Sequence, residues 1–240
     1  MSEHVVFELC AETLAACEAA REGGADRIEL CSALSEDGLT PSHGLIGAAV
    51  KQSGLPVHVL VRPRTGDFVY SEAEFALMRE DLVHARTLGA SGVVIGILLR
   101  DGRVDIKRTS ELVALAAPLE VTFHRAFDLT PELEEALEDV IATGCHRLLT
   151  SGGEGTAIAG ADALTRLVDL AATRIAIAAG GGVRPDNAAT LVQRTKVKQL
   201  HSSLRRKVEQ RSASALASAD SGCVVDVDDV RAIVRSLNSL

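Results

Sequence analysis

The sequence predicts a single (β/α)8 barrel, the TIM-barrel fold, on three observations. Short β-branched runs alternate with longer helical patterns along the chain of 240 residues. Eight such runs each precede a helical segment, which is the pattern of a closed ring of parallel strands. Polar residues also collect where the apolar runs end, and a barrel gathers these strand ends on the rim that holds its site. A doubly wound open sheet stays an alternative, because strand number alone does not prove closure.

The order of the elements follows from these runs and from the signals that end them. Strands are expected near residues 5–9, 26–30, 57–61, 92–96, 119–123, 146–150, 174–178 and 197–201. Helices are expected near residues 11–22, 42–52, 72–88, 105–116, 131–142, 160–171, 185–193 and 226–238. Gly23 and Gly24, Gly89 and Gly144 follow the expected helix ends, where a left-handed cap residue is common. Pro131 and Pro185 stand in first turns, where a missing N–H is harmless.

The composition is that of one α/β domain over residues 1–240. The chain is 47% hydrophobic but only 2% aromatic and has no Trp, so Ala, Val, Leu and Ile must fill the core. No linker divides it. Residues 203–225, before the last helix, are polar, rich in Ser and Ala, and without a clear strand. We expect them to cover the rim as a mobile loop or an irregular helix.

Charge and hydropathy exclude several classes of function. The net charge is −8 and no cluster of Lys and Arg marks a recognition helix, which disfavours nucleic-acid binding. No apolar stretch approaches a membrane span, and the start MSEHVVFELC does not resemble a signal peptide. The five cysteines contain no CxxC pair and are expected to be reduced thiols. These features favour a cytoplasmic protein.

Strand alternation turns a set of charged residues toward the barrel axis. Glu8, Glu29, Arg62, His124 and His201 share the inward phase, while apolar neighbours face the helices. Isolated charges inside a barrel are costly, so these groups must pair with one another or meet solvent and a ligand. One interpretation is an internal ion network, and the other is a ligand site at the barrel mouth.

A catalytic interpretation assigns proton transfer to three of these residues. Glu8 and Glu29 lie on neighbouring strands, so one carboxyl should have a raised pKa and could act as a general acid. His124 follows the fifth strand and could shuttle protons near neutral pH.

An anionic ligand would be held by arginines and by glycine-rich loops. Arg125 could clamp an anion or pair instead with Asp128, and Asp67 could merely cap the helix that begins near Ser71. The Gly180–Gly182 run follows the seventh strand, where barrels often bind phosphate through backbone N–H groups and a helix N-terminus. The candidate substrate-binding residues are Arg62, Arg64, Asp67, Arg125, Asp128, Ser151, Gly180, Gly181, Gly182, His201 and Ser202.

Several motifs together resemble a known family. They are EGGADRIELC at 22–31, GLTPS at 38–42, RPRTGDFVYS at 62–71, VTFHRAFD at 121–128, LLTSGG at 148–153, AGGGVRPDN at 179–187 and LHSS at 200–203. This combination resembles the CutC family, which is associated with copper homeostasis. The chain departs from the family pattern where Asp37 precedes Gly38 and where Leu204 follows the LHSS motif.

The resemblance implies a TIM barrel, a cytosolic location, a homodimer and Cu(I) as a metal. It places the copper-binding thiols at Cys10 and Cys31, in the inward phase of adjacent strands. Thiolates suit Cu(I), although two buried cysteines can also be small apolar residues. Two functions therefore stay open: a copper-binding protein of copper homeostasis, or a lyase, isomerase or hydrolase acting on a small anionic molecule.

Overall fold

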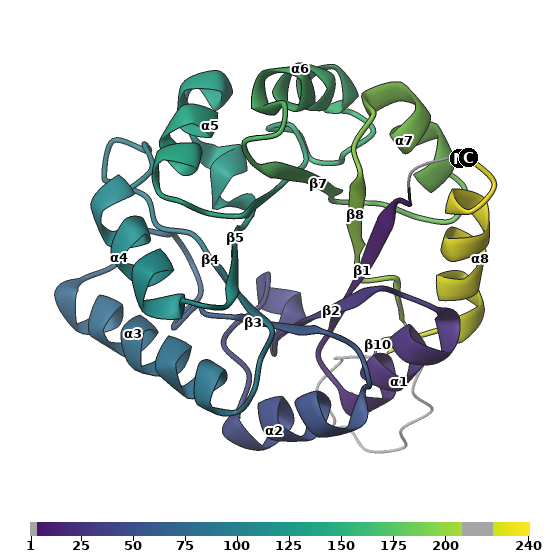
Figure 1. Ribbon diagram of the computed structural model, residues 1–240, viewed down its shortest axis with the longest axis horizontal. Helices are drawn as coiled ribbons and strands as arrows, with labels where there is room; N and C mark the ends of the chain where they lie inside the picture. The colour runs from purple at the N-terminus through teal and green to yellow at the C-terminus, as the bar shows by residue number, and fades with distance from the viewer. Residues whose placement is uncertain (1–3, 208–222) are drawn as a thin grey trace, which may run out of the picture.

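The structure is a computed structural model that describes residues 4–207 and 223–240. Eight parallel strands form a closed barrel in sequence order, and β8 returns to pair with β1 (Figure 1). The strands are β1 (Val6–Ala11), β2 (Arg27–Leu30), β3 (Val57–Leu60), β4 (Gly92–Ile95), β5 (Glu120–Phe123), β6 (Arg147–Thr150), β7 (Ala176–Gly180) and β8 (Gln199–Ser202). The predicted TIM barrel is therefore confirmed, and the open sheet is excluded.

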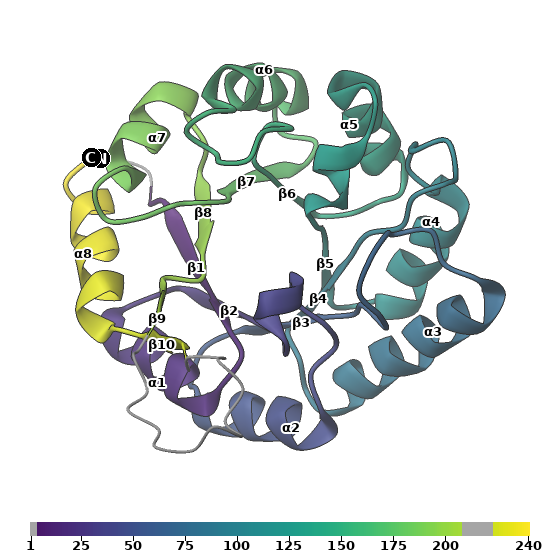
Figure 2. The same cartoon turned by 180° about the vertical axis from the view of Figure 1, so that it is seen from behind.

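A ring of helices surrounds the strands in both views (Figures 1 and 2). The helices are α1 (Leu14–Gly23), α2 (His43–Gln52), α3 (Glu72–Thr87), α4 (Ile106–Ala116), α5 (Leu133–Ala142), α6 (Ala161–Ala171), α7 (Ala188–Thr195) and α8 (Val227–Leu237). Helix α8 packs against α1 and α7 and so completes the ring. Among the described residues, no helix combines the length and the apolar character that crossing a bilayer requires.

Local signals in the sequence fix several helix ends. Ser71 and Glu74 form a capping box at the start of α3, each satisfying a backbone N–H of the other. Gly24 takes the left-handed conformation just after α1, as its position predicts. Helix α7 begins at Ala188 rather than at the predicted Pro185, so the segment between Gly182 and Asn187 belongs to a loop at the barrel mouth.

The register of β1 determines which charges meet inside the barrel. Glu8 lies opposite Arg27 of β2 and opposite His201 of β8, and Cys10 lies opposite Glu29. Phe7 and Leu9 belong to the main apolar cluster, which the helices share. The predicted alternation of inward polar and outward apolar side chains is therefore confirmed for this strand.

The segment at residues 203–225 contains strands that the sequence did not predict. Strands β9 (Arg205–Lys207) and β10 (Cys223–Val225) form a small antiparallel sheet at its two ends. The residues between them, 208–222, lie outside the described part of the chain. The run of cations at 205–207 obscured β9, because it has no apolar face. Arg206 instead pairs with Asp226 at 3.3 Å, just before α8.

Candidate functional site

A cavity of about 370 Å³ opens at the carboxyl ends of the strands. Its charged, thiol and imidazole lining residues are Cys10, Glu29, Asp37, Arg62, His124, Arg125, Asp128, Arg184 and His201. Its apolar lining comes from Leu34, Leu60, Phe68, Leu129 and Leu149. Leu34 belongs to the short helix η1 (Leu34–Glu36), which lies over the barrel opening in Figure 2. The strand ends thus meet around one cavity, as the sequence predicted.

Glu8 lies at the centre of a buried ion cluster. Its carboxylate accepts hydrogen bonds from Arg27 Nε at 2.7 Å and from both terminal nitrogens of Arg147, which comes from β6 on another side of the barrel. Burial would raise the pKa of Glu8, but Arg147 and His201 outweigh it and hold that pKa well below its ordinary value. Glu8 does not line the cavity and stays ionised, so the ion-network interpretation describes it.

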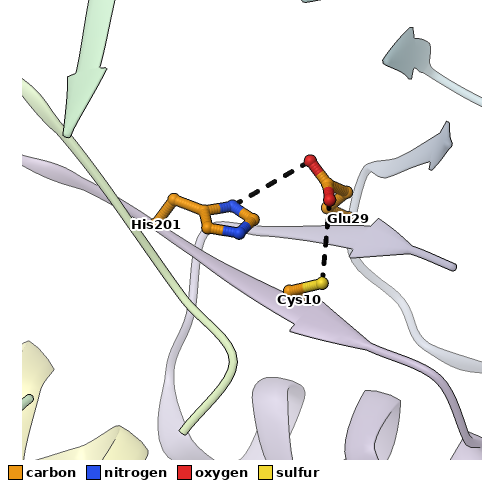
Figure 3. A group of neighbouring side chains, drawn as sticks. All are labelled: Cys10, Glu29 and His201. Carbon is orange, nitrogen blue, oxygen red and sulfur yellow. Dashed lines mark hydrogen bonds and ion pairs between the residues drawn. The ribbon is translucent and has the colours of Figure 1, made fainter. Parts of the chain in front are cut away.

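His201 links this ion cluster to the cavity. Its Nδ1 lies 2.7 Å from Glu8 Oε1. The same nitrogen lies 4.0 Å from Glu29 Oε2, and Figure 3 shows this pair. An ionised carboxylate can only accept, so His201 Nδ1 carries the proton of this hydrogen bond. The other ring nitrogen, Nε2, has no hydrogen-bond partner among the described residues. Nε2 is therefore the ring nitrogen of His201 that is left to a ligand in the cavity.

Glu29 is the carboxyl that faces the cavity. Burial, reinforced by the charge of Glu8, raises the pKa of Glu29, although His201 opposes this shift. Its Oε2 is buried and has no hydrogen-bond partner within the described segments. The two carboxyls on neighbouring strands thus differ, as predicted: one has a lowered pKa and the other a raised pKa.

Cys10 and Cys31 lie side by side next to Glu29. Their sulfur atoms are 3.7 Å apart, and Cys10 Sγ is 3.6 Å from Glu29 Oε1. The Cys31 thiol and burial raise the pKa of Cys10 well above its ordinary value. Cys10, Glu29 and His201 also offer three potential metal-ligand atoms within 4.8 Å of one another (Figure 3). The two thiols of Cys10 and Cys31 suit a soft metal ion such as Cu(I), whereas the Glu29 carboxylate suits harder ions.

Arg62 braces the loops around the mouth. Its terminal nitrogens donate to the carbonyl oxygens of Glu36, Gly38 and Gly66, each at 2.9 Å, and its guanidinium stacks over Phe68. Arg62 lines the cavity, and these carbonyl groups engage its two terminal nitrogens, whereas its buried Nε has no partner among the described residues. It pairs with no carboxylate among residues 4–207 and 223–240, whereas Arg147 pairs with Glu8 and holds it ionised.

Arg64 and Asp67 were predicted to contact a ligand, but they lie outside the cavity. Arg64 donates to Asp67 Oδ1 at 2.8 Å and to Glu74 Oε1 at 2.5 Å, and none of the three lines the mouth. Asp67 also accepts from the backbone N–H of Val69. The pair therefore ties the β3–α3 loop to the first turn of α3, and Ser71 rather than Asp67 caps that helix.

Arg125, Asp128 and Ser151 form a second polar cluster at the rim. Arg125 donates to Asp128 Oδ2 and to Ser151 Oγ, both at 2.8 Å. Asp128 also accepts from the backbone N–H groups of Ser151 and Gly153 and from the hydroxyl of Thr150. The salt-bridge alternative for Arg125 is therefore the one observed. Asp128 organises the β6 loop, and Arg125 keeps its place in the cavity lining.

His124 differs from its predicted role as a proton shuttle. Burial, followed by the charge of Arg62, lowers its pKa to about 3. The ring therefore stays neutral near pH 7. Its Nδ1 accepts the backbone N–H of Ala126 at 3.0 Å, while its buried Nε2 has no partner within the described ranges.

The glycine run after β7 divides between two roles. Gly181 and Gly182 have φ angles of 101° and 69° and line the cavity. Gly180 ends β7 and does not line it; a Cβ there would lie 2.6 Å from a methyl carbon of Leu149. Ser202 lines the cavity, although its hydroxyl donates to Val183 O at 2.7 Å.

Arg184 is a cavity residue that sequence reasoning missed. It is exposed, and it forms no ion pair with any residue of the described segments. Its Nη1 reaches only Val183 O and Ser202 Oγ, each at 3.5 Å. The signal was present in the AGGGVRPDN motif, where Arg184 directly precedes the helix expected near 185–193. Arg184 is a cation available to a ligand.

Comparison with known proteins assigns this chain to a family. The sequence model of the CutC family matches residues 5–206. The chain belongs to the CutC family. A CutC family protein of Chromobacterium violaceum is 50% identical over 85% of this chain and 82% of its own length. A CutC family protein of Vibrio vulnificus strain CMCP6 is 46% identical over 92% of this chain and 89% of its own length.

A solved structure supports the same family at the level of the fold. The crystal structure of the CutC protein from Streptococcus agalactiae matches with a TM-score of 0.79 at 33% identity, over 83% of this chain and 98% of that chain. Its name associates that protein with copper homeostasis. The N-(5'-phosphoribosyl)anthranilate isomerase from Pyrococcus furiosus, at 15% identity and a TM-score of 0.59 over 99% of this chain and 100% of that chain, shares the barrel fold only. The cytosolic location and the homodimer stay predictions of the resemblance.

Proposed function

We propose that this CutC family member is an enzyme that binds a small anionic molecule in the barrel mouth and transfers a proton on it. The observation that carries this proposal is the pairing of His201 Nδ1 with Glu8 at 2.7 Å beside the cavity. A carboxylate that holds one imidazole nitrogen as a donor leaves the other as a proton acceptor of fixed orientation. Glu29, whose pKa is raised, is the second proton-transfer group within reach of the same space.

The far side of the cavity suits a negatively charged ligand. Arg184 supplies a guanidinium without a carboxylate partner among the described residues, and Gly181 and Gly182 let the backbone approach a ligand without side-chain obstruction. A volume of about 370 Å³ lies at the low end of the range for small-molecule sites. Carboxylates and phosphate esters of a few carbons are therefore the ligand class.

Deuterium exchange tests this function. The protein is incubated in D2O with a panel of small carboxylates and phosphate esters, and NMR follows the replacement of carbon-bound protons. We expect exchange in at least one compound and a loss of about 100-fold or more in His201→Asn, because the proton acceptor is gone. Arg184→Met should raise the substrate concentration required by at least about tenfold, because a charged hydrogen-bond donor is lost.

His146 supplies the matched control. It is exposed, and its Nδ1 accepts the backbone N–H of Val121 away from the mouth. The His146→Asn variant should catalyse the exchange of the compound's carbon-bound protons at the wild-type rate. The proposal fails if no compound of the panel exchanges, or if His201→Asn and His146→Asn reduce the exchange equally.

We propose Cu(I) binding as a second function, because the two sulfur atoms of Cys10 and Cys31 lie 3.7 Å apart. These two thiols would hold the ion, with His201 and Glu29 as neighbouring ligands. Binding must displace the thiol proton of Cys10, whose pKa is raised. The apparent affinity for Cu(I) should therefore increase with pH.

An anaerobic Cu(I) titration against a competing chelator tests this second function. We expect about one bound equivalent in the wild type and none in the double variant Cys10→Ser/Cys31→Ser. The control is Cys17→Ser/Cys145→Ser, which removes two other buried thiols outside the cavity lining. Equal affinity in both double variants, or wild-type affinity no better than that of a simple thiol, would remove copper binding from consideration.

A further inference from the structure

The hydrogen bonds of His124 fix which of its ring nitrogens carries the proton. The backbone N–H of Ala126 donates to Nδ1 at 3.0 Å, and a backbone amide can only donate, so Nδ1 is unprotonated. The ring is neutral near pH 7, because burial and the charge of Arg62 disfavour the imidazolium. The proton of the neutral ring must then lie on Nε2. His124 is thus a hydrogen-bond donor through Nε2 and cannot accept there.

The Nε2–H group of His124 has no hydrogen-bond partner in the described part of the chain, although packing holds the ring firmly in place. Nε2 is buried without a hydrogen bond to any described residue, although His124 lines the mouth cavity. The ring packs against Phe68, with centroids 4.9 Å apart, and against the backbone of Gly96, where a Cβ would lie 2.3 Å from Cε1. Buried N–H groups are rarely left unpaired. The missing acceptor is therefore expected to come from the cavity.

The surroundings of the ring favour an oxygen that carries negative charge. Arg62 acts on His124 through its charge, while its own terminal nitrogens donate to the carbonyl oxygens of Glu36, Gly38 and Gly66. Arg62 therefore adds positive potential, and its buried Nε–H is a second donor without a partner among the described residues. A fixed neutral N–H beside a positive charge is a typical means of stabilising a carbonyl oxygen that gains negative charge.

We propose that His124 Nε2–H donates a hydrogen bond to a carbonyl oxygen of the ligand, so that the substrate class is a small anion with a carbonyl group, such as a 2-oxo acid. This inference rests on the proposed function, because it assumes that the mouth binds a small anion. In the mouth cavity, His124 would bind the carbonyl group of the substrate and Arg184 would bind its anionic group. His124 is thereby a binding residue for the reacting part of the substrate and not a proton carrier.

Two small acids test the inference on the full-length protein. Pyruvate and propionate share a carboxylate, but only pyruvate has the additional carbonyl oxygen. NMR titration of each acid should give saturable binding, with pyruvate roughly fivefold tighter, the value of one ordinary hydrogen bond. His124→Phe should abolish this preference while propionate still binds, and His124→Gln, which keeps an N–H donor, should retain part of it.

The same samples check the tautomer and separate the two proposals. Long-range proton–nitrogen spectra should show the ring of His124 protonated on Nε2 only, and addition of pyruvate should shift that proton. His146→Phe is the matched control, since its Nδ1 also accepts a backbone N–H but it lies away from the cavity, and it should keep the preference for pyruvate. A protonated Nδ1 of His124, or an equal preference for pyruvate in the wild type and in His124→Phe, would overturn only the proposed role of His124. Failure of both acids to bind overturns the proposed function as well.

Discussion

Replacing Glu8 with Gln is expected to lower the free energy of unfolding by about 3–5 kcal/mol, the usual effect of removing one partner from a buried ion cluster. The carboxylate is fully buried and accepts from Arg27, Arg147 and His201. A neutral amide cannot balance two guanidinium groups that are almost wholly excluded from water. Chemical denaturation followed by circular dichroism measures the change.

An exposed ion pair provides the control for this variant. Glu138 receives two hydrogen bonds from Arg174, but both side chains are about half exposed. Glu138→Gln should therefore leave the free energy of unfolding nearly unchanged, because exposed ion pairs contribute little to stability. Equal effects of Glu8→Gln and Glu138→Gln would mean that water reaches the cluster inside the barrel.

Replacing Gly160 with Ala should destabilise the protein by about 3 kcal/mol, the upper end of the usual cost of overpacking. A Cβ at Gly160 would lie 1.9 Å from the carbonyl oxygen of Ser151 and 3.1 Å from Gly152 Cα. Both are backbone atoms, so the loop after β6 must move as a whole. Because Ser151 accepts from Arg125, the variant should also weaken ligand binding at the mouth.

Gly155 lies in the same loop and provides the comparison. A Cβ there would meet no atom within 4 Å, and its φ is not positive. Gly155→Ala should therefore keep wild-type stability within about 0.5 kcal/mol, as most surface substitutions do. Thermal unfolding of the two variants side by side measures the difference; similar melting temperatures would contradict the close approach of Gly160 to Ser151.

The barrel could be predicted from the sequence because its determinants are local. Alternation with a period of two placed Glu8, Glu29 and His201 on the inner face, and the order of strands and helices implied closure. The alternation of polar and apolar residues did not predict β9, because its three residues are all cationic. The sequence pattern also placed the start of α7 too early, because Pro185 suits a loop as well as the first turn of a helix.

The partners of the site residues could not be predicted, because they depend on contacts across the ring. Arg147 reaches Glu8 from β6, and no sequence spacing indicates that meeting. The conformations of the loops turn Arg64 away from the mouth and place Arg184 in its lining. The tautomer of His124 depends on a single backbone N–H, that of Ala126. These features follow from register and loop conformation, which the residue pattern leaves open.

A crystal structure of the protein grown in phosphate tests most directly whether the barrel mouth is an anion site. We expect one phosphate in the mouth cavity, in contact with the guanidinium of Arg184 and close to Gly181 and Gly182. Water alone in this cavity at saturating phosphate, or phosphate bound only elsewhere on the molecule, would contradict it.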